Sequence, residues 1–171
     1  LSLQSGDDMI LKRMKRRHAR DDAFAIVDKL RSLRPDMVFG ADIIAGFPTE
    51  TDATFANTLA IVAEADLTYL HVFPYSPREG TPAARMPQVS KRVARTRATL
   101  LRAEGERQFA KLCASRVGMV ENVLIERNGL GRTEQFVPVS VPESQPGELL
   151  TVRITGMAAD GLVGEALREA A

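Results

Sequence analysis

Residues 37–46, MVFGADIIAG, decide the fold of this chain because they form a nearly continuous apolar run. Such a run is typical of a strand that is covered on both faces, as in a parallel sheet. A helical pattern follows over residues 49–65, and a second strand pattern over residues 69–73. Strands separated by a helix of this length form parallel βαβ units with right-handed crossovers. The sequence therefore predicts an α/β fold here.

The start of the chain has the pattern of another strand end. Residues 1–8, LSLQSGDD, run from an apolar segment through a glycine turn into a helix that Asp7 or Asp8 is expected to cap. A second helix is expected from Asp21 or Asp22 to the residue before Pro35. With so few strands, the sheet or barrel would be incomplete, so we expect this chain to be the C-terminal part of a longer protein.

The last third of the chain has a different secondary-structure pattern, with short strands separated by turns. A long Arg-rich helix is predicted over residues 90–115, and Asn128-Gly129 and Asp160-Gly161 are turn signals beyond it. Short strands of this kind form a small antiparallel β-barrel. The strands are predicted over residues 117–126, 133–139, 149–154 and 162–163. The domain organisation predicted is an incomplete barrel over 1–89, a linker helix over 90–116 and a β-barrel over 117–171.

Composition excludes several classes of protein. No apolar run approaches the roughly 20 residues that cross a bilayer, so a membrane protein is not expected. Cys113 is the only cysteine, which excludes an internal disulfide and a multi-cysteine metal site in this chain. A buried apolar role is expected for Cys113, and a cytoplasmic location for the protein.

Charge is distributed unevenly. Residues 1–116 carry 19 Lys and Arg against 14 Asp and Glu, whereas residues 117–171 carry 4 against 8. The basic excess lies in residues 12–20, KRMKRRHAR, and in residues 91–116. Segments of this kind can bind phosphates, although a solvated helix face is the commoner reason for them.

Three loops follow predicted strand ends, at residues 4–6, 46–50 and 75–78. Loops at the carboxyl ends of parallel strands meet at one rim, where ligands bind. Gln4 and Glu50 would offer polar groups there. The alternative is that these loops are only turns that begin helices.

These loops also carry a family resemblance. Residues 3–16 (LQSGDDMILKRMKR), 42–51 (DIIAGFPTET) and 71–84 (HVFPYSPREGTPAA) resemble three segments of the radical S-adenosylmethionine methylthiotransferases. The last third is similar to the TRAM module, the small β-barrel with which these enzymes contact RNA. The resemblance implies the C-terminal part of a partial (β/α) radical-SAM barrel followed by a TRAM-like β-barrel.

The cofactors follow from the resemblance. It implies S-adenosylmethionine beside one [4Fe-4S] cluster and a second cluster in a further N-terminal domain of the parent protein. The cysteine triad CxxxCxxC that holds the catalytic cluster is absent from this chain. We therefore expect this chain to hold no cluster, to have no catalytic or metal-ligating residue, and to be inactive without the missing part. An isolated half barrel is also expected to self-associate through exposed strand edges.

The resemblance implies binding residues at the three loops. The S-adenosylmethionine side of the rim would be lined by Gln4, Ser5 and Arg16. The adenine and ribose edge would be approached by Gly46, Phe47, Pro48 and Glu50. The substrate mouth would be lined by Tyr75, Ser76 and Arg78.

In the β-barrel, a local basic patch is the candidate RNA contact. It would consist of Arg127, Arg132 and Arg153, with Phe136 as a stacking platform. Phe136 is nevertheless more often a core residue in a strand of this pattern.

The target is expected to be a tRNA. Residues 131–139, GRTEQFVPV, together with residues 41–50, ADIIAGFPTE, look most like the branch that modifies threonylcarbamoyladenosine next to the anticodon. Isopentenyladenosine in tRNA and an aspartate of a ribosomal protein are the other targets of the family. Two further alternatives are a stand-alone RNA-binding module and a generic α/β ligand-binding domain.

Overall fold

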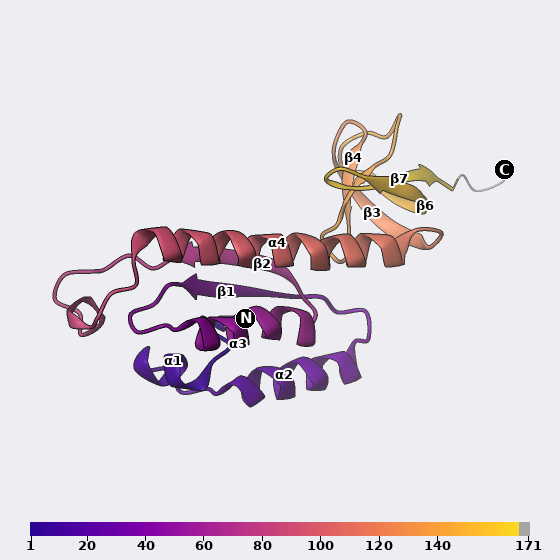
Figure 1. Ribbon diagram of the computed structural model, residues 1–171. Helices are drawn as coiled ribbons and strands as arrows, with labels where there is room; N and C mark the ends of the chain where they lie inside the picture. The colour runs from indigo at the N-terminus through magenta and orange to yellow at the C-terminus, as the bar shows by residue number, and fades with distance from the viewer. Residues whose placement is uncertain (168–171) are drawn as a thin grey trace. The chain divides into compact units, whose positions relative to one another are not determined.

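A computed structural model describes residues 1–167 of the chain (Figure 1). The last four residues of the predicted β-barrel domain, 168–171, lie outside the described residues. Two compact units divide the chain, Leu1–Phe109 and the part from Ala110 onward. The elements of the first unit are α1 (Asp8–Arg13), α2 (Arg20–Leu33), β1 (Phe39–Ala45), α3 (Asp52–Glu64), β2 (Leu67–Pro74) and the 3₁₀ turn η1 (Ala83–Arg85). Those that follow are α4 (Lys91–Arg116), β3 (Val120–Arg127), β4 (Leu130–Thr133), β5 (Pro138–Ser140), β6 (Leu149–Ala158) and β7 (Gly161–Ala166).

The first unit is built on the parallel pair β1–β2, in which Ile43 lies opposite Val72. On the other edge of β1, Gln4 forms a single parallel bridge with Ile43. The Gln4 amide donates to the Asp42 carbonyl at 2.7 Å, and the Ile44 amide donates to the Gln4 carbonyl at 2.9 Å. The predicted α/β fold with parallel strands is therefore confirmed. That these strands form part of a radical-SAM barrel stays a prediction.

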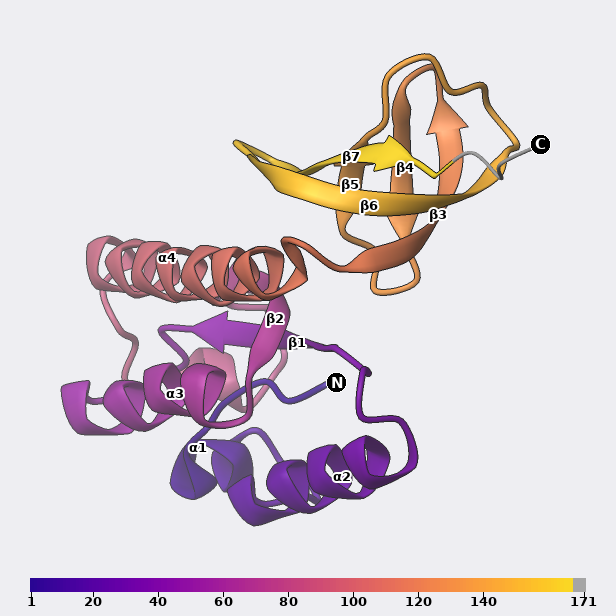
Figure 2. The same cartoon turned by 90° about the vertical axis from the view of Figure 1, so that its right-hand side faces the viewer.

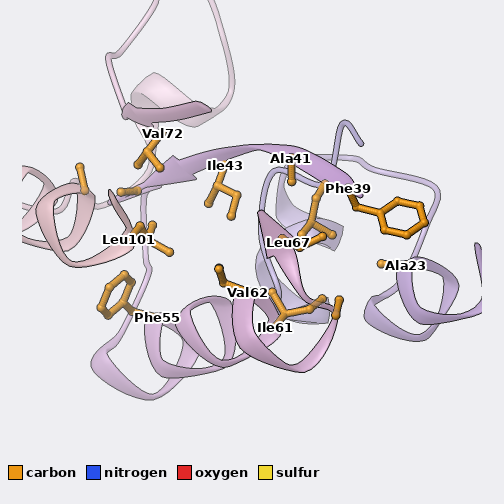
Figure 3. Close-up of a cluster of buried hydrophobic side chains, with 14 of the residues drawn as sticks. Ala23, Phe39, Ala41, Ile43, Phe55, Ile61, Val62, Leu67, Val72 and Leu101 are labelled. Atoms are coloured by element: carbon orange, nitrogen blue, oxygen red, sulfur yellow. The ribbon is translucent and has the colours of Figure 1, made fainter. Parts of the chain in front are cut away.

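One face of β1 supplies the core of this unit. Alternate residues Phe39, Ala41, Ile43 and Ala45 are buried, and the residues between them are half-buried. Helices α2 and α3 lie on one side of β1 in both views (Figures 1 and 2), and side chains from all these elements meet in one cluster (Figure 3). Because alternate strand residues point to opposite faces, Asp42 and Ile44 lie on the face turned away from this core.

Local hydrogen bonds set the helix starts. Asp7 caps α1 as expected, since its Oδ1 accepts the Ile10 amide at 3.1 Å. The expectation for α2 is wrong: its N-cap is Ala19, whose amide donates to Asp22 Oδ2 at 2.7 Å. Asp22 thus stabilises the helix start from within the first turn, because its carboxylate reaches back to the chain before it.

The second unit contains a closed five-stranded barrel in the order β3-β4-β5-β7-β6. This confirms the predicted small β-barrel. Four of its strand pairs are antiparallel and the β5–β7 pair is parallel. Among the described residues, no helix is long and apolar enough to cross a membrane.

The strand predicted over residues 133–139 is interrupted by a turn. The Phe136 amide donates to the Thr133 carbonyl at 2.9 Å, and the φ angle of Phe136 is 64°. Strand β4 therefore ends at Thr133 and β5 begins at Pro138. Phe136 is 68% exposed, so the expectation that it belongs to the core is wrong.

Candidate functional site

A cavity of about 630 Å³ lies at the carboxyl ends of β1 and β2, on the face of the sheet opposite the core. It is lined by Gln4, Asp42, Ile44, Phe73, Pro74, Tyr75, Ser76, Arg78, Thr81 and Ala83. The cavity therefore brings together one residue of the first predicted loop and three of the third. Its volume is in the range of sites for small molecules and cofactors.

The lining of the cavity is chemically divided. Ile44, Phe73 and Pro74 contribute apolar side chains to the lining. Asp42 contributes a carboxylate, which only accepts hydrogen bonds when ionised, and Arg78 contributes a guanidinium, which only donates. A ligand with an apolar ring and both donor and acceptor groups would match this arrangement.

The loop over residues 46–50 does not line this cavity but is held against the protein interior. The Gly46 amide donates to Glu50 Oε1 at 3.0 Å, and Arg97 Nη1 on α4 donates to the same oxygen at 2.7 Å. Arg97 Nη2 also donates to Asp52 Oδ1 at 2.6 Å. Burial raises the pKa of Glu50, although the Gly46 amide and Arg97 counteract it. The other oxygen, Oε2, is buried without a partner.

The same loop touches the cavity through an aromatic contact. Phe47 is buried, and its ring meets the ring of Tyr75 edge to face, with centroids 5.2 Å apart. The Tyr75 amide donates to the Ala45 carbonyl at 2.8 Å, which extends the β1–β2 pairing by one residue. The position of Tyr75 in the cavity wall therefore depends on the conformation of the 46–50 loop.

Ser5 and Arg16 lie away from the lining. Ser5 is fully buried, with its Oγ 3.0 Å from Thr58 Oγ1 and accepting the Asp7 amide at 3.2 Å. Arg16 is exposed and donates to the Ser2 carbonyl at 2.7 Å. Cofactor binding by Ser5, Arg16 and residues 46–50 stays a prediction.

In the barrel, the structure pairs two of the four candidate RNA residues. Arg132 Nη1 donates to the Phe136 carbonyl at 3.1 Å, and its Nε donates to Glu126 Oε2 at 3.1 Å. Arg127 and Arg153 are exposed but lie near opposite ends of β3. Arg127 is the last residue of β3, whereas Arg153 on β6 pairs with Val120, the first residue of β3. Of the four candidate RNA residues, Arg132 and Phe136 are thus the two that a hydrogen bond brings into contact.

Comparison with known proteins gives the family. No family model matches the chain. The chain is 50% identical over 158 residues to a threonylcarbamoyladenosine tRNA methylthiotransferase of Rickettsia prowazekii, covering 92% of this chain and 38% of that protein. It is 40% identical over 177 residues to a tRNA-2-methylthio-N(6)-dimethylallyladenosine synthase of Rickettsia felis, covering 98% and 40%. A protein of that second name from Cereibacter sphaeroides is 39% identical over 174 residues, covering 96% and 40%.

The chain belongs to the methylthiotransferase family. This confirms the resemblance of its three motifs, and the higher identity to the first relative modestly favours the threonylcarbamoyladenosine branch. The chain spans about two-fifths of the length of these relatives.

The family's two cofactors fit this chain differently. A [4Fe-4S] cluster requires several thiolates, and the single cysteine, Cys113, is buried, with its pKa raised by desolvation. No residues of this chain therefore fit a cluster. S-adenosylmethionine fits better, because the cavity offers an apolar surface beside the carboxylate of Asp42 and the amide of Gln4.

Asp42, Ile44 and Phe73 are lining residues that were not predicted as site residues. The signal for Asp42 is present in the sequence, since a carboxylate inside an otherwise apolar strand needs a polar environment or a ligand. Ile44 and Phe73 carry no comparable signal, because apolar strand residues are expected in the core.

Proposed function

We propose that the protein to which this chain belongs attaches a methylthio group to a modified adenosine of tRNA. The proposed nucleoside is N6-threonylcarbamoyladenosine next to the anticodon, and the proposed location is the cytoplasm. The observation that carries this proposal is the cavity at the ends of β1 and β2. It lies in a chain that is 50% identical over 158 residues to an enzyme named for that reaction.

S-adenosylmethionine, when bound next to a reduced cluster, would supply the radical chemistry that activates a carbon–hydrogen bond of the target. The cluster would be held by residues outside this chain. In this chain, Gln4 and Asp42 would bind polar groups of the cofactor, and Ile44 would pack against its ring. Tyr75, Ser76 and Arg78 would orient the nucleoside at the mouth of the cavity and help exclude water.

The barrel would contact the RNA through Phe136 and Arg132. Phe136 is an exposed aromatic residue with a positive φ angle, a conformation that bulky residues rarely adopt. Its carbonyl is held by Arg132, so the ring is presented to solvent on an ordered turn. An exposed ring of this kind can stack on an unpaired base.

Nucleoside analysis of tRNA tests the proposed reaction. The full-length protein would be expressed in cells whose tRNA lacks methylthio groups, and digested tRNA would be analysed by mass spectrometry. A methylthio derivative of threonylcarbamoyladenosine is expected. A methylthio derivative of dimethylallyladenosine would instead assign the protein to the branch of its 36–40% identical relatives. Unmodified tRNA, despite an intact cluster in the enzyme, would contradict methylthiolation and leave RNA binding as the function to test.

The role of Gln4 is tested by S-adenosylmethionine affinity. Gln4→Ala in the full-length protein is expected to raise the Kd for S-adenosylmethionine, because a hydrogen-bonding group of the cavity is lost. Gln145→Ala, at an exposed position of the second unit, is the matched control and should leave the Kd unchanged. Equal Kd values for wild type and Gln4→Ala would remove Gln4 from the cofactor site.

A further inference from the structure

The segment over residues 12–17 forms a basic surface that the cavity does not account for. Five of its six residues are cations, and all five are exposed: Lys12, Arg13, Lys15, Arg16 and Arg17. These five side chains make no ion pair within the described part of the protein, residues 1–167, and we call this segment the 12–17 surface.

The backbone of the 12–17 surface is held in a strained turn. The Lys15 φ angle is 57°, in the left-handed region that normally favours glycine. The Arg16 amide donates to the Leu11 carbonyl at 3.0 Å, which is the hydrogen bond that closes a helix through a left-handed residue. A lysine at this position is less stable than a glycine would be. Strain of this kind is often retained where the side chain has a function.

Hydrogen bonds connect the 12–17 surface to the edge of the cavity. Arg16 Nη2 donates to Ser2 Oγ at 2.8 Å, and the Gln4 side chain donates to the same oxygen at 3.0 Å. Gln4 in turn lines the cavity. Arg13 contacts Thr49 in the loop that follows β1. Helix α1 accordingly lies at the end of the sheet to which the β1 arrow points (Figure 1).

We infer that the 12–17 surface binds backbone phosphates of the tRNA whose nucleoside enters the cavity. The inference rests on the proposed function and adds where the RNA backbone is held. Exposed cations that are spread along a segment suit a chain of phosphates, whereas a single small anion is usually enclosed by its ligands. The β-barrel is a poor alternative for this phosphate contact, because residues 117–171 carry twice as many acidic as basic side chains.

The salt dependence of tRNA binding tests this inference. Affinity of the full-length protein for tRNA would be measured between 50 and 300 mM KCl, for wild type and for the triple variant Lys12→Gln/Lys15→Gln/Arg17→Gln. These three are chosen because Arg13 and Arg16 make hydrogen bonds within the protein. Each phosphate contact that is lost lowers the slope of log K against log salt by about 0.7–0.9. A slope lower by about 2 and an affinity at least about tenfold weaker at 100 mM KCl are expected.

Two further variants separate binding from folding. Lys15→Gly removes a charge but relieves the left-handed strain, so it should raise the Tm while weakening tRNA binding. Lys29→Gln removes an exposed cation from α2, which runs away from the cavity end, and should leave the slope unchanged.

The outcomes distinguish the inference from the proposed function. If wild type binds tRNA and the triple variant has the same slope, the inference is wrong and the proposed function stands. If Lys29→Gln weakens binding as much as Lys15→Gly does, the attraction is diffuse and the inference is also wrong. Wild-type protein that does not bind tRNA would overturn both. Loss of binding to anionic vesicles, without any tRNA effect, would assign the surface to a membrane instead.

Discussion

Replacing Arg97 with methionine should destabilise the first unit more than any other single charge removal on α4. The change leaves Glu50 buried, with its side chain only 1% exposed and without its charged partner. Removing one member of a buried ion pair destabilises a protein by about 3–5 kcal/mol. The contact with Asp52 adds little, about 0–1 kcal/mol, because that carboxylate is exposed to solvent. We therefore expect a loss of about 3–4 kcal/mol near pH 7.5.

The stability lost in Arg97→Met should depend on pH. The environment of Glu50 determines whether this loss grows or shrinks as pH rises. Burial raises the pKa of Glu50 in the folded state, and Arg97 opposes this rise. Without Arg97 the folded pKa rises further. A carboxyl whose folded pKa exceeds its unfolded value is most favourable below the unfolded pKa and loses stability as pH rises through the folded one. The Arg97→Met variant should therefore be closest to wild type near pH 4.5 and fall behind as pH increases.

Urea unfolding at pH 4.5, 6 and 8, followed by circular dichroism, measures both effects. Arg95→Met, at an exposed position of α4, is the matched control and should change stability by less than about 0.5 kcal/mol. Glu50→Gln should cost less than Arg97→Met, because Arg97 keeps Asp52 and the Glu50 carbonyl as partners. An Arg97→Met loss below about 1 kcal/mol, or one equal at all three pH values, would refute this reasoning.

Three other substitutions or reactions test particular contacts. Gly46→Ala should lower the Tm by more than Gly80→Ala. Both glycines have positive φ angles, but their surroundings differ: a Cβ added at Gly46 would lie 2.8 Å from the Ala94 Cα, whereas a Cβ added at Gly80 would meet no atom within 4 Å. Phe136→Ala should leave stability within about 0.5 kcal/mol of wild type yet weaken tRNA binding by about 1–3 kcal/mol, as measured by fluorescence anisotropy. The Cys113 thiol should resist a disulfide reagent in the folded protein and react only after unfolding, because it is buried and desolvation raises its pKa; fast reaction in native buffer would contradict its burial.

The elements of the first unit could be predicted because their residues follow simple periodicities. The apolar run over residues 37–46 predicts a strand, and the structure has β1 there. The helical spacing over residues 49–65 predicts a helix, and the structure has α3 there. The strand over residues 133–139 could not be resolved into β4 and β5, because the turn depends on a positive φ angle at Phe136. Nothing in an aromatic residue signals such a conformation, which tertiary contacts such as the Arg132 hydrogen bond help to hold.

The candidate site was predictable only as a set of loops. Strand ends in a parallel sheet lie at one edge, so Gln4 and Tyr75 could be expected near each other. The sequence could not tell that Glu50 turns inward, because that depends on an arginine 47 residues later in the chain. Nor could the sequence show that the Ser5 hydroxyl is hydrogen-bonded to the Thr58 hydroxyl on α3. Self-association of the isolated chain stays a prediction.

The short parallel pair of the barrel makes one seam weaker than the rest. Strands β5 and β7 share only the pairs Val139–Leu162 and Ser140–Val163, whereas β3 and β6 share five. Proline at the start of β5 also has no amide to donate. The barrel should therefore fluctuate open along β5–β7 before its other seams separate, so amide protons there would exchange with solvent first. During folding this pair would be the last to close, so an open, curved sheet would precede the finished barrel.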